Sequence, residues 1–226
     1  FDLIIIGAGS GNTIPGPDHV GWRIAIIEKD RFGGTCLNRG CIPSKMLIHA
    51  ADVAEICIRL DGLPLAVVTA QSAVHAADVA ETIHTATPFG LTARLEHLDW
   101  DRLIGRVWQR IDPVADEGEA WRQTQPTTTV FKGEARFVGD KTLEVNGQRL
   151  TAPRIILAAG ARPIIPAIPG LEQVRYHTSD TIMRLPRQPQ RLAVLGGGSI
   201  GAELSHFFGA LGFAITILHL GDRLLA

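Results

Sequence analysis

Two short apolar runs in this chain each lead directly into a cluster of glycines. FDLIII, at 1–6, is followed by GAGSGN, and RLAVL, at 191–195, is followed by GGGSIG. A strand buried in a parallel sheet is typically such a run, and glycines after it let the backbone approach the phosphates of a dinucleotide. Two such units predict an α/β fold with two Rossmann-like, dinucleotide-binding parts.

The first glycine cluster lacks one glycine of the G-x-G-x-x-G pattern. Gly7 and Gly9 match it, but Asn12 stands at the last position. A second predicted strand, RIAIIE, ends in Glu28, at the spacing that a ribose-binding acid requires. The Pro-Gly-Pro run at 15–17 interrupts the segment between the strands, so we expect only a short helix there.

The second glycine cluster carries the complete pattern. Gly196, Gly198 and Gly201 fill its three positions, and the predicted helix AELSHFFGALG and strand AITILHL follow. The alternative is that the glycines serve only tight turns. Two strand–turn–helix units in one chain instead indicate two bound dinucleotides.

A pair of cysteines lies in the stretch GGTCLNRGCIPSK, at 33–45. Cys36 and Cys41 are separated by residues that include Gly40, so a small disulfide can close and open between them. The alternatives are two buried structural cysteines or half of a metal site. A metal site needs further ligands, and the only other cysteine, Cys57, lies well downstream without a His-rich motif. We therefore expect redox chemistry and no metal.

Cys41 lies just before a predicted helix. Pro43 is favoured in a first helical turn, so we expect the Cys41 sulfur to face unpaired backbone N–H groups and the positive end of the helix dipole. Such surroundings stabilise a thiolate and bring a cysteine pKa from about 8.5 to roughly 3.5–7.5. Lys45, one turn further on, adds a positive charge.

Short predicted strands and turns fill much of the region between the two glycine clusters. TTTVFKGEARF, KTLEV and QRLTAPRIILAAG read as strands, with turns at 139–140 and 146–147. The proline-rich run at 161–170 predicts a linker. The expected parts are a first domain at 1–160, a linker at 161–187, and the beginning of a second domain at 188–226.

Residues 48–55 recur almost letter for letter at 74–81. Both copies are rich in alanine and predict helix, and residues 56–81 read as an insertion that we expect at the surface. Two copies are too few for a repeat architecture, so a local duplication is the simpler explanation. His49 and His75 are interpreted as surface or packing residues rather than ligands.

Apolar residues at helical spacing predict a helix within residues 100–122. Pro113 is expected to end this pattern. Trp100, Trp108 and Trp121 are interpreted as core or helix-packing residues rather than a stacking platform for bases.

The charge and apolar patterns argue against several classes of function. The formal net charge is −1, and no basic stripe with interleaved aromatics is present, which argues against nucleic acid and membrane surfaces as partners. No apolar run approaches the roughly 20 residues that span a bilayer. Three cysteines without a secretory signal favour a cytoplasmic location, where a disulfide is usually catalytic.

The motifs GAGSGN, GGTCLNRGCIPSK, IILAAGARP and GGGSIGAE, together with Glu28, resemble the flavin-dependent pyridine nucleotide disulfide oxidoreductases. This is the group of glutathione reductase and dihydrolipoyl dehydrogenase. GSGN, RIDPVADEGEAWR and YHTSDTIMRL look most like its mycothione reductase branch, which implies mycothiol disulfide as substrate. The resemblance implies a three-layer FAD-binding domain followed by the start of an NAD(P)-binding domain.

The resemblance also implies roles for particular residues. Cys41 would touch the flavin, Cys36 would attack the substrate disulfide, and Lys45 would lie near the reactive flavin nitrogen. The remaining FAD contacts would be Gly7, Gly9, Ser10 and Gly11 at the pyrophosphate, Glu28 at the ribose, Gly34 and Thr35 along the flavin, Ala135 at the adenine, and Ala159 and Gly160 after the last strand. Gly196, Gly198, Gly201 and Glu203 would receive the nicotinamide nucleotide.

The nicotinamide nucleotide is expected to be NADPH, with NADH as the alternative. NAD-preferring relatives carry an acid at the end of the second strand of this unit, whereas His219 stands here and repels no 2′-phosphate. Leu220 occupies the place of the arginine expected in NADPH users, although Arg223 is close.

Family members continue well beyond the position of Ala226, so the resemblance implies that this chain is the front part of a homodimeric enzyme. The missing part would carry the His–Glu acid–base pair, and we expect little turnover from residues 1–226 alone. A dihydrolipoyl dehydrogenase and a non-catalytic flavin-binding module are the alternative functions.

Overall fold

The computed structural model describes residues 1–58, 60–61, 92–93 and 98–225. The chain divides into two compact units, one of residues 1–43 with 108–183 and the other of residues 44–107 with 184–226. Each unit is described by itself. The domain bounds expected from the sequence stay a prediction.

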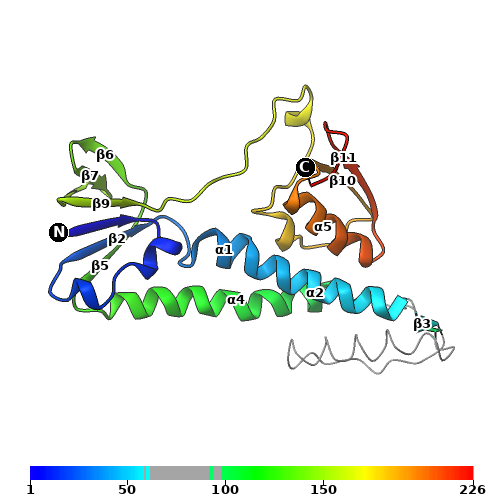
Figure 1. Ribbon diagram of the computed structural model, residues 1–226, viewed down its shortest axis with the longest axis horizontal. Helices are drawn as coiled ribbons and strands as arrows, with labels where there is room; N and C mark the ends of the chain where they lie inside the picture. The colour runs from blue at the N-terminus through cyan, green and yellow to red at the C-terminus, as the bar shows by residue number, and fades with distance from the viewer. Residues whose placement is uncertain (59, 62–91, 94–97, 226) are drawn as a thin grey trace. The chain divides into compact units, whose positions relative to one another are not determined.

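The first unit is built on a four-stranded parallel sheet with the order β5-β2-β1-β9 (Figure 1). Leu3 of β1 is level with Ile24 of β2 and with Arg154 of β9. This sheet confirms the α/β class predicted from the apolar runs. Its strands are β1 (Leu3–Ile6), β2 (Ile24–Glu28), β5 (Thr128–Lys132) and β9 (Arg154–Leu157).

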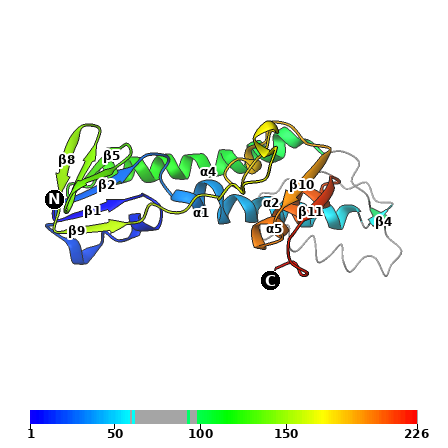
Figure 2. The ribbon, with the colours of Figure 1, turned by 90° about the horizontal axis from the view of Figure 1, so that it is seen from above.

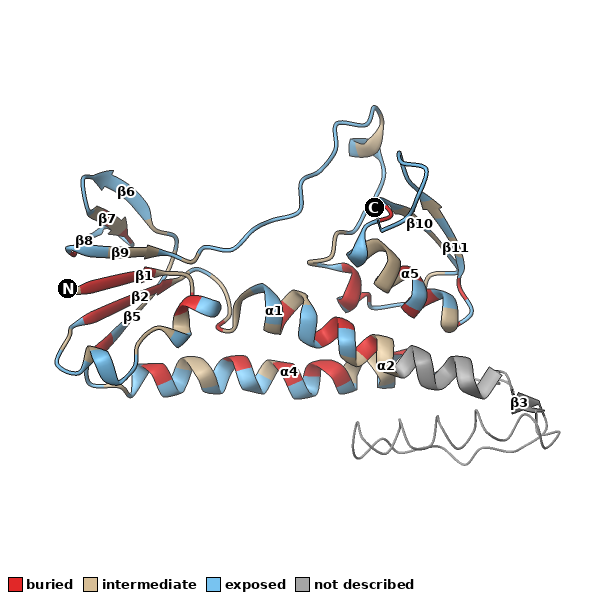
Figure 3. Ribbon diagram, in the orientation of Figure 1, coloured by how far each residue is buried: buried red, intermediate tan, exposed pale blue. Residues whose placement is uncertain are grey.

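Both faces of the central strands are buried (Figure 3). Side chains alternate along a strand, so Ile4 packs on one face and Ile5 on the other. Ile4 joins a cluster with Leu143 and Leu150 of an antiparallel meander at 136–151, whereas Ile5 packs with Phe32. This double burial explains why β1 and β2 are apolar at almost every position.

The meander covers one face of the sheet and is antiparallel throughout. Asn146 (φ 50°) and Gly147 (φ 75°) form the left-handed turn between its last two strands, as the Asn-Gly pair predicts. The strands are β6 (Arg136–Gly139), β7 (Thr142–Val145) and β8 (Gln148–Thr151).

The connection between β1 and β2 contains only two short 3₁₀ helices, η1 (Ser10–Thr13) and η2 (Pro17–His19). This confirms the short helix expected from the Pro-Gly-Pro run. After β2 comes α1 (Gly34–Arg39), a short helix that the sequence did not predict, and then α2 (Cys41–Ile58). The start of α2 at Cys41 confirms the expected helix around Pro43.

Helix α4 (Trp100–Gln123) continues through Pro113, so the prediction that this proline ends the helix was wrong. Pro113 lies on the exposed face, while Ile111 and Ala115 beside it are 1% exposed. The Arg31 guanidinium also bonds the side chain and the carbonyl of Asp112. Burial and this anchor hold the helix on both sides of the missing N–H group.

The tryptophans of α4 have two different environments. Trp100 and Trp108 are buried, and their indole N–H groups donate to the carbonyls of Leu185 at 2.9 Å and Met183 at 3.2 Å. Trp121 is 55% exposed. The predicted packing role is therefore confirmed for Trp100 and Trp108. It was wrong for Trp121, which lies on the outer face near the end of the helix.

The second unit contains a strand–helix–strand element, visible in both views (Figures 1 and 2). β10 and β11 pair in parallel, as the second glycine cluster predicts. Trp100 packs with Phe207, Phe208 and Phe213 in an aromatic cluster. The elements are β10 (Arg191–Leu195), α5 (Ser199–Ala210), β11 (Ala214–Leu218), and the short antiparallel pair β3 (Leu60–Asp61) and β4 (Thr92–Ala93); η4 (Leu171–Gln173) and η5 (Ile182–Arg184) are single turns elsewhere in the chain.

Some sequence predictions fall outside the described residues. The second copy of the duplicated stretch, at 74–81, and most of the expected insertion lie there, as does His75. The first copy is helical within α2, and His49 is half-buried, which fits a packing residue. Among the residues with described positions, no helix is both long and apolar enough to cross a membrane.

Candidate dinucleotide and dithiol site

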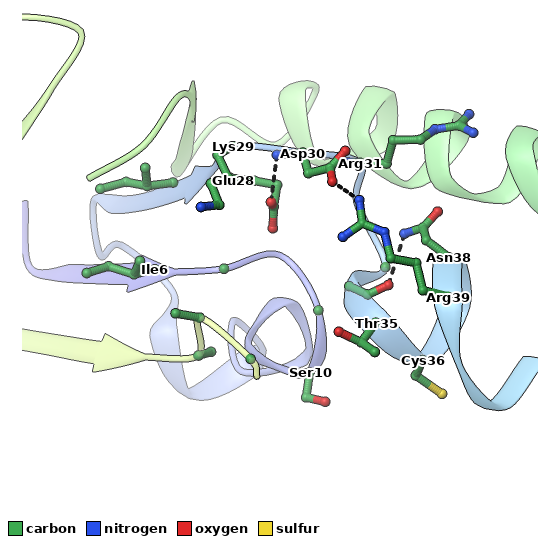
Figure 4. Close-up of a pocket in the computed structure, with 18 of the residues that line it drawn as sticks. Ile6, Ser10, Glu28, Lys29, Asp30, Arg31, Thr35, Cys36, Asn38 and Arg39 are labelled. Carbon is green, nitrogen blue, oxygen red and sulfur yellow. Dashed lines mark hydrogen bonds and ion pairs between the residues drawn. The ribbon is translucent and has the colours of Figure 1, made fainter. Parts of the chain in front are cut away.

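A cavity of about 650 Å³ opens in the first unit (Figure 4). Five segments line it: the glycine turn after β1, the end of β2, the cysteine-bearing segment around α1, the residues after β5, and the residues after β9. Its volume lies within the usual range for cofactor pockets. Of the predicted site residues, it brings together Gly7, Gly9, Ser10, Glu28, Gly34, Thr35, Cys36, Cys41, Ala135, Ala159 and Gly160.

The glycines of this cavity allow two backbone segments to touch. Gly34 has φ +61°, and a Cβ added there would lie 2.7 Å from the Gly9 Cα. Gly7 has φ +105°, and its Cβ would lie 2.1 Å from the Ala158 carbonyl oxygen. No side chain fits at either point. The wall is therefore made of bare backbone, which is the surface that a dinucleotide phosphate requires.

Gly11 and Asn12 have structural contacts instead of places in the cavity wall. A Cβ at Gly11 would lie 2.7 Å from the Ala158 Cβ, so the glycine permits close packing under the turn. Asn12 accepts a hydrogen bond from Arg122 Nε at 2.8 Å on its side chain and a second Arg122 bond on its carbonyl. The contact of Gly11 with a pyrophosphate stays a prediction.

The Glu28 carboxylate is fixed at the end of β2. Its Oε2 accepts from the Ala8 N–H at 2.7 Å and its Oε1 accepts from the Asp30 N–H at 2.8 Å. A carboxylate has further lone pairs, so this one can also accept hydrogen bonds from the hydroxyls of a ribose.

Asp30 and Arg39 pair along the cavity wall and join the end of β2 to α1 (Figure 4). Burial raises the pKa of Asp30, but the Arg39 hydrogen bond, the Arg31 backbone N–H, and the charges of Arg39 and Arg162 together lower it. Asp30 is thus held as an anion. Sequence reasoning missed this pair, since no motif relates the two side chains.

Cys36 and Cys41 are exposed thiols that share the cavity wall. The hydrogen bond with the Cys41 side chain is the main cause that raises the pKa of Cys36, and burial and the Cys41 charge add to it. The backbone N–H groups of Cys41 and Ile42 bond the Cys36 sulfur and lower its pKa by a smaller amount. These N–H groups at the start of α2 therefore serve Cys36, whereas we expected such groups to face Cys41.

Asn38, between the cysteines, anchors α1. It is 6% exposed, and its Nδ2 donates to the carbonyl oxygens of Phe32 at 2.8 Å and Gly34 at 3.0 Å. These bonds tie the cysteine-bearing helix α1 to its own first residue and to Phe32 before it. Sequence reasoning missed this role, although the position of an amide inside the cysteine motif was a possible signal.

The second unit carries its own glycine turn before α5. Gly196 has φ +111°, and a Cβ at Gly201 would lie 2.2 Å from the Gly196 carbonyl oxygen. The His219 Nδ1 accepts from the Gly197 N–H at 3.2 Å. Lys45 and Glu203 form an ion pair within this unit, and Gly198 is the N-cap of α5. The unit thus brings Lys45 to one predicted nucleotide contact.

No group of three or more His, Cys, Asp or Glu side chains is placed to hold a metal ion in the described part of the chain.

Residues 1–226 match the family model described as pyridine nucleotide-disulphide oxidoreductase. Mycothione reductase of Mycobacterium tuberculosis is 38% identical over 231 residues, which cover 100% of this chain and 45% of that protein. Mercuric reductase of Staphylococcus aureus is 34% identical and is covered to 37%. The HOCl-induced flavoprotein disulfide reductase RclA from Escherichia coli has a TM-score of 0.76 at 27% identity, with 100% of this chain and 43% of that chain covered.

The chain therefore belongs to the pyridine nucleotide-disulphide oxidoreductase family, whose members bind FAD and use NAD(P)H. This confirms the resemblance seen in the sequence motifs. The chain spans less than half the length of these relatives.

Proposed function

We propose that the protein carrying this chain is a flavoprotein disulfide reductase. Electrons pass from NADPH through FAD to the Cys36–Cys41 disulfide and on to a low-molecular-weight disulfide, with mycothiol disulfide as the substrate. The observation that carries the proposal is that one cavity of the first unit is lined by the bare glycine turn, by Glu28 and by both thiols. When bound, FAD supplies two-electron transfer between the nucleotide and the disulfide.

The residues of the cavity divide the binding of FAD among them. The backbone at Gly7, Gly9 and Ser10 would face the diphosphate, and Glu28 would accept hydrogen bonds from the ribose. Gly34 and Thr35 would lie along the flavin, Ala135 would meet the adenine, and Ala159 and Gly160 would complete the wall. Lys45 does not line the cavity, and its place near the flavin is proposed on the family resemblance alone. The glycine turn before α5, with Glu203, receives the nicotinamide nucleotide.

The two thiols carry out the exchange steps. Cys36, as thiolate, attacks one sulfur of the substrate disulfide, which forms a mixed disulfide and releases one substrate thiol. Cys41 then attacks the Cys36 sulfur, which releases the second thiol and closes the Cys36–Cys41 bond. The pKa of Cys36 is raised, mainly by its hydrogen bond with the Cys41 side chain, so a base has to take its proton before Cys36 attacks.

The choice of NADPH rests on His219, which stands where an acid would repel a 2′-phosphate. Mycothiol disulfide rests on the motifs of the mycothione reductase branch and on the 38% identity to that enzyme of M. tuberculosis. In its complete form the protein acts as a homodimer in the cytoplasm.

The test uses the protein that carries this chain, loaded with FAD and given NADPH. Thiols are counted with a maleimide, and turnover is followed with mycothiol disulfide, glutathione disulfide and lipoamide. We expect two new thiols per chain on reduction, turnover with mycothiol disulfide, and no turnover in Cys36→Ser. Preferential turnover of dihydrolipoamide with NAD⁺ would instead identify a dihydrolipoyl dehydrogenase, and FAD binding without new thiols would identify a non-catalytic module.

A further inference from the structure

The glycine turn of the first unit opens no α-helix. A dinucleotide diphosphate normally meets the N-terminus of a helix, whose aligned peptide dipoles favour negative charge. Here the turn leads into η1, a single 3₁₀ turn at Ser10–Thr13. A turn of this length adds few aligned dipoles, so the charge of a diphosphate has to be compensated by another group.

Four cationic side chains line the same cavity, and three of them are already paired with carboxylates. Lys29 pairs with Glu134 at 2.9 Å, Arg31 with Asp112 and Asp116, and Arg39 with Asp30. The fourth is Arg162. Among the described residues, its only hydrogen bond is from NH1 to the carbonyl of the preceding residue, Ala161, at 3.2 Å.

Arg162 comes two residues after Gly160, which lies close to helix α1. Gly160 has φ +72°, and a Cβ there would lie 3.8 Å from the Thr35 Oγ1. The charge of Arg162 also acts on Asp30 at the end of β2. Arg162 thus lines the same cavity as the glycine turn, the end of β2 and α1, and its charge reaches the end of β2.

We propose that Arg162 binds the diphosphate of FAD and supplies the positive charge that the missing helix does not. A guanidinium presents paired N–H donors that match phosphate oxygens, and it keeps its charge at all relevant pH values. This inference rests on the proposed FAD site and adds to it a ligand that the glycine motif does not contain.

The test is a titration of the purified protein that carries this chain, freed of its flavin. Flavin fluorescence follows FAD and riboflavin, and isothermal titration calorimetry follows adenosine and ADP. Arg162→Gln raises the Kd for FAD about 10-fold to 100-fold, since a charged hydrogen bond is lost. Arg162→Lys recovers part of the affinity. Riboflavin and adenosine, which have no phosphate, bind equally to wild type and variant. ADP, which has a diphosphate, binds more weakly to the variant, as FAD does. Arg175→Gln, an exposed arginine that does not line the cavity, is the matched control and leaves all four unchanged.

A second comparison excludes an indirect effect through Asp30. If Arg162 served only to neutralise that carboxylate, the loss caused by Arg162→Gln would vanish in an Asp30→Asn background. We expect the loss to persist there. Equal FAD affinity of wild type and Arg162→Gln, or a loss that vanishes with Asp30→Asn, overturns the inference while the FAD site stands. A wild-type protein that binds no FAD overturns the proposed function itself.

Discussion

Replacing Gly34 by alanine tests the backbone contact that shapes the cavity. The left-handed φ of +61° costs an alanine about 1–2 kcal/mol. Its Cβ would also lie 2.7 Å from the Gly9 Cα, and relieving such overpacking costs about 1–3 kcal/mol. The free energy of unfolding should therefore fall by about 2–5 kcal/mol, and FAD affinity should fall with it because the turn is pushed out of place.

The assay is urea unfolding followed by circular dichroism, together with the FAD titration. Gly105→Ala is the matched control, since Gly105 lies within α4 and nothing stands within 4 Å of its added Cβ. That change should raise the free energy of unfolding by about 0.5–1 kcal/mol. A Gly34→Ala chain with the unfolding midpoint and FAD affinity of the wild type would refute the close approach.

Three further predictions follow from the described contacts. Cys41→Ser removes the main cause that raises the pKa of Cys36, so the pH profile of Cys36 alkylation by iodoacetamide should move to lower pH; an unchanged profile would contradict the thiol pairing. Pro113→Ala restores a helical N–H group and should raise the free energy of unfolding by about 1–3 kcal/mol in urea, and a loss of stability would show that the helix depends on the proline. Because the pKa of Asp30 is lowered in the fold, its carboxylate stabilises the protein above the ordinary value of 3.8, and this contribution is lost as pH falls through the lower folded value. Acid unfolding of Asp30→Asn should lack that component, and an acid-unfolding curve identical to wild type would exclude it.

The sequence predicted the parallel strands well because their side chains are buried on two faces. β1 and β2 are apolar at nearly every position, and a glycine turn or an acid marks where each strand ends. The same local signals located the start of α2 at Cys41. These features depend on neighbours in the chain, so a single sequence suffices to predict them.

The features that the sequence missed depend on partners far along the chain. Helix α4 passes through Pro113 because Arg31 bonds Asp112, and no local pattern relates these positions. The short helix α1 begins and ends beside glycines, which local propensity assigns to turns. The Asp30–Arg39 pair likewise forms only when β2 and α1 come together.

The close approach of Gly9 and Gly34 gives the cavity wall two kinds of position with different mutational tolerance. At these two glycines the chain is packed backbone against backbone, so any residue larger than glycine displaces the dinucleotide turn or the helix that carries Cys36. At other positions Lys29 and Arg162 line the wall with long side chains that lie outside α1. Substitutions at these charged positions can adjust how tightly the cofactor is held while the geometry of the thiols stays intact.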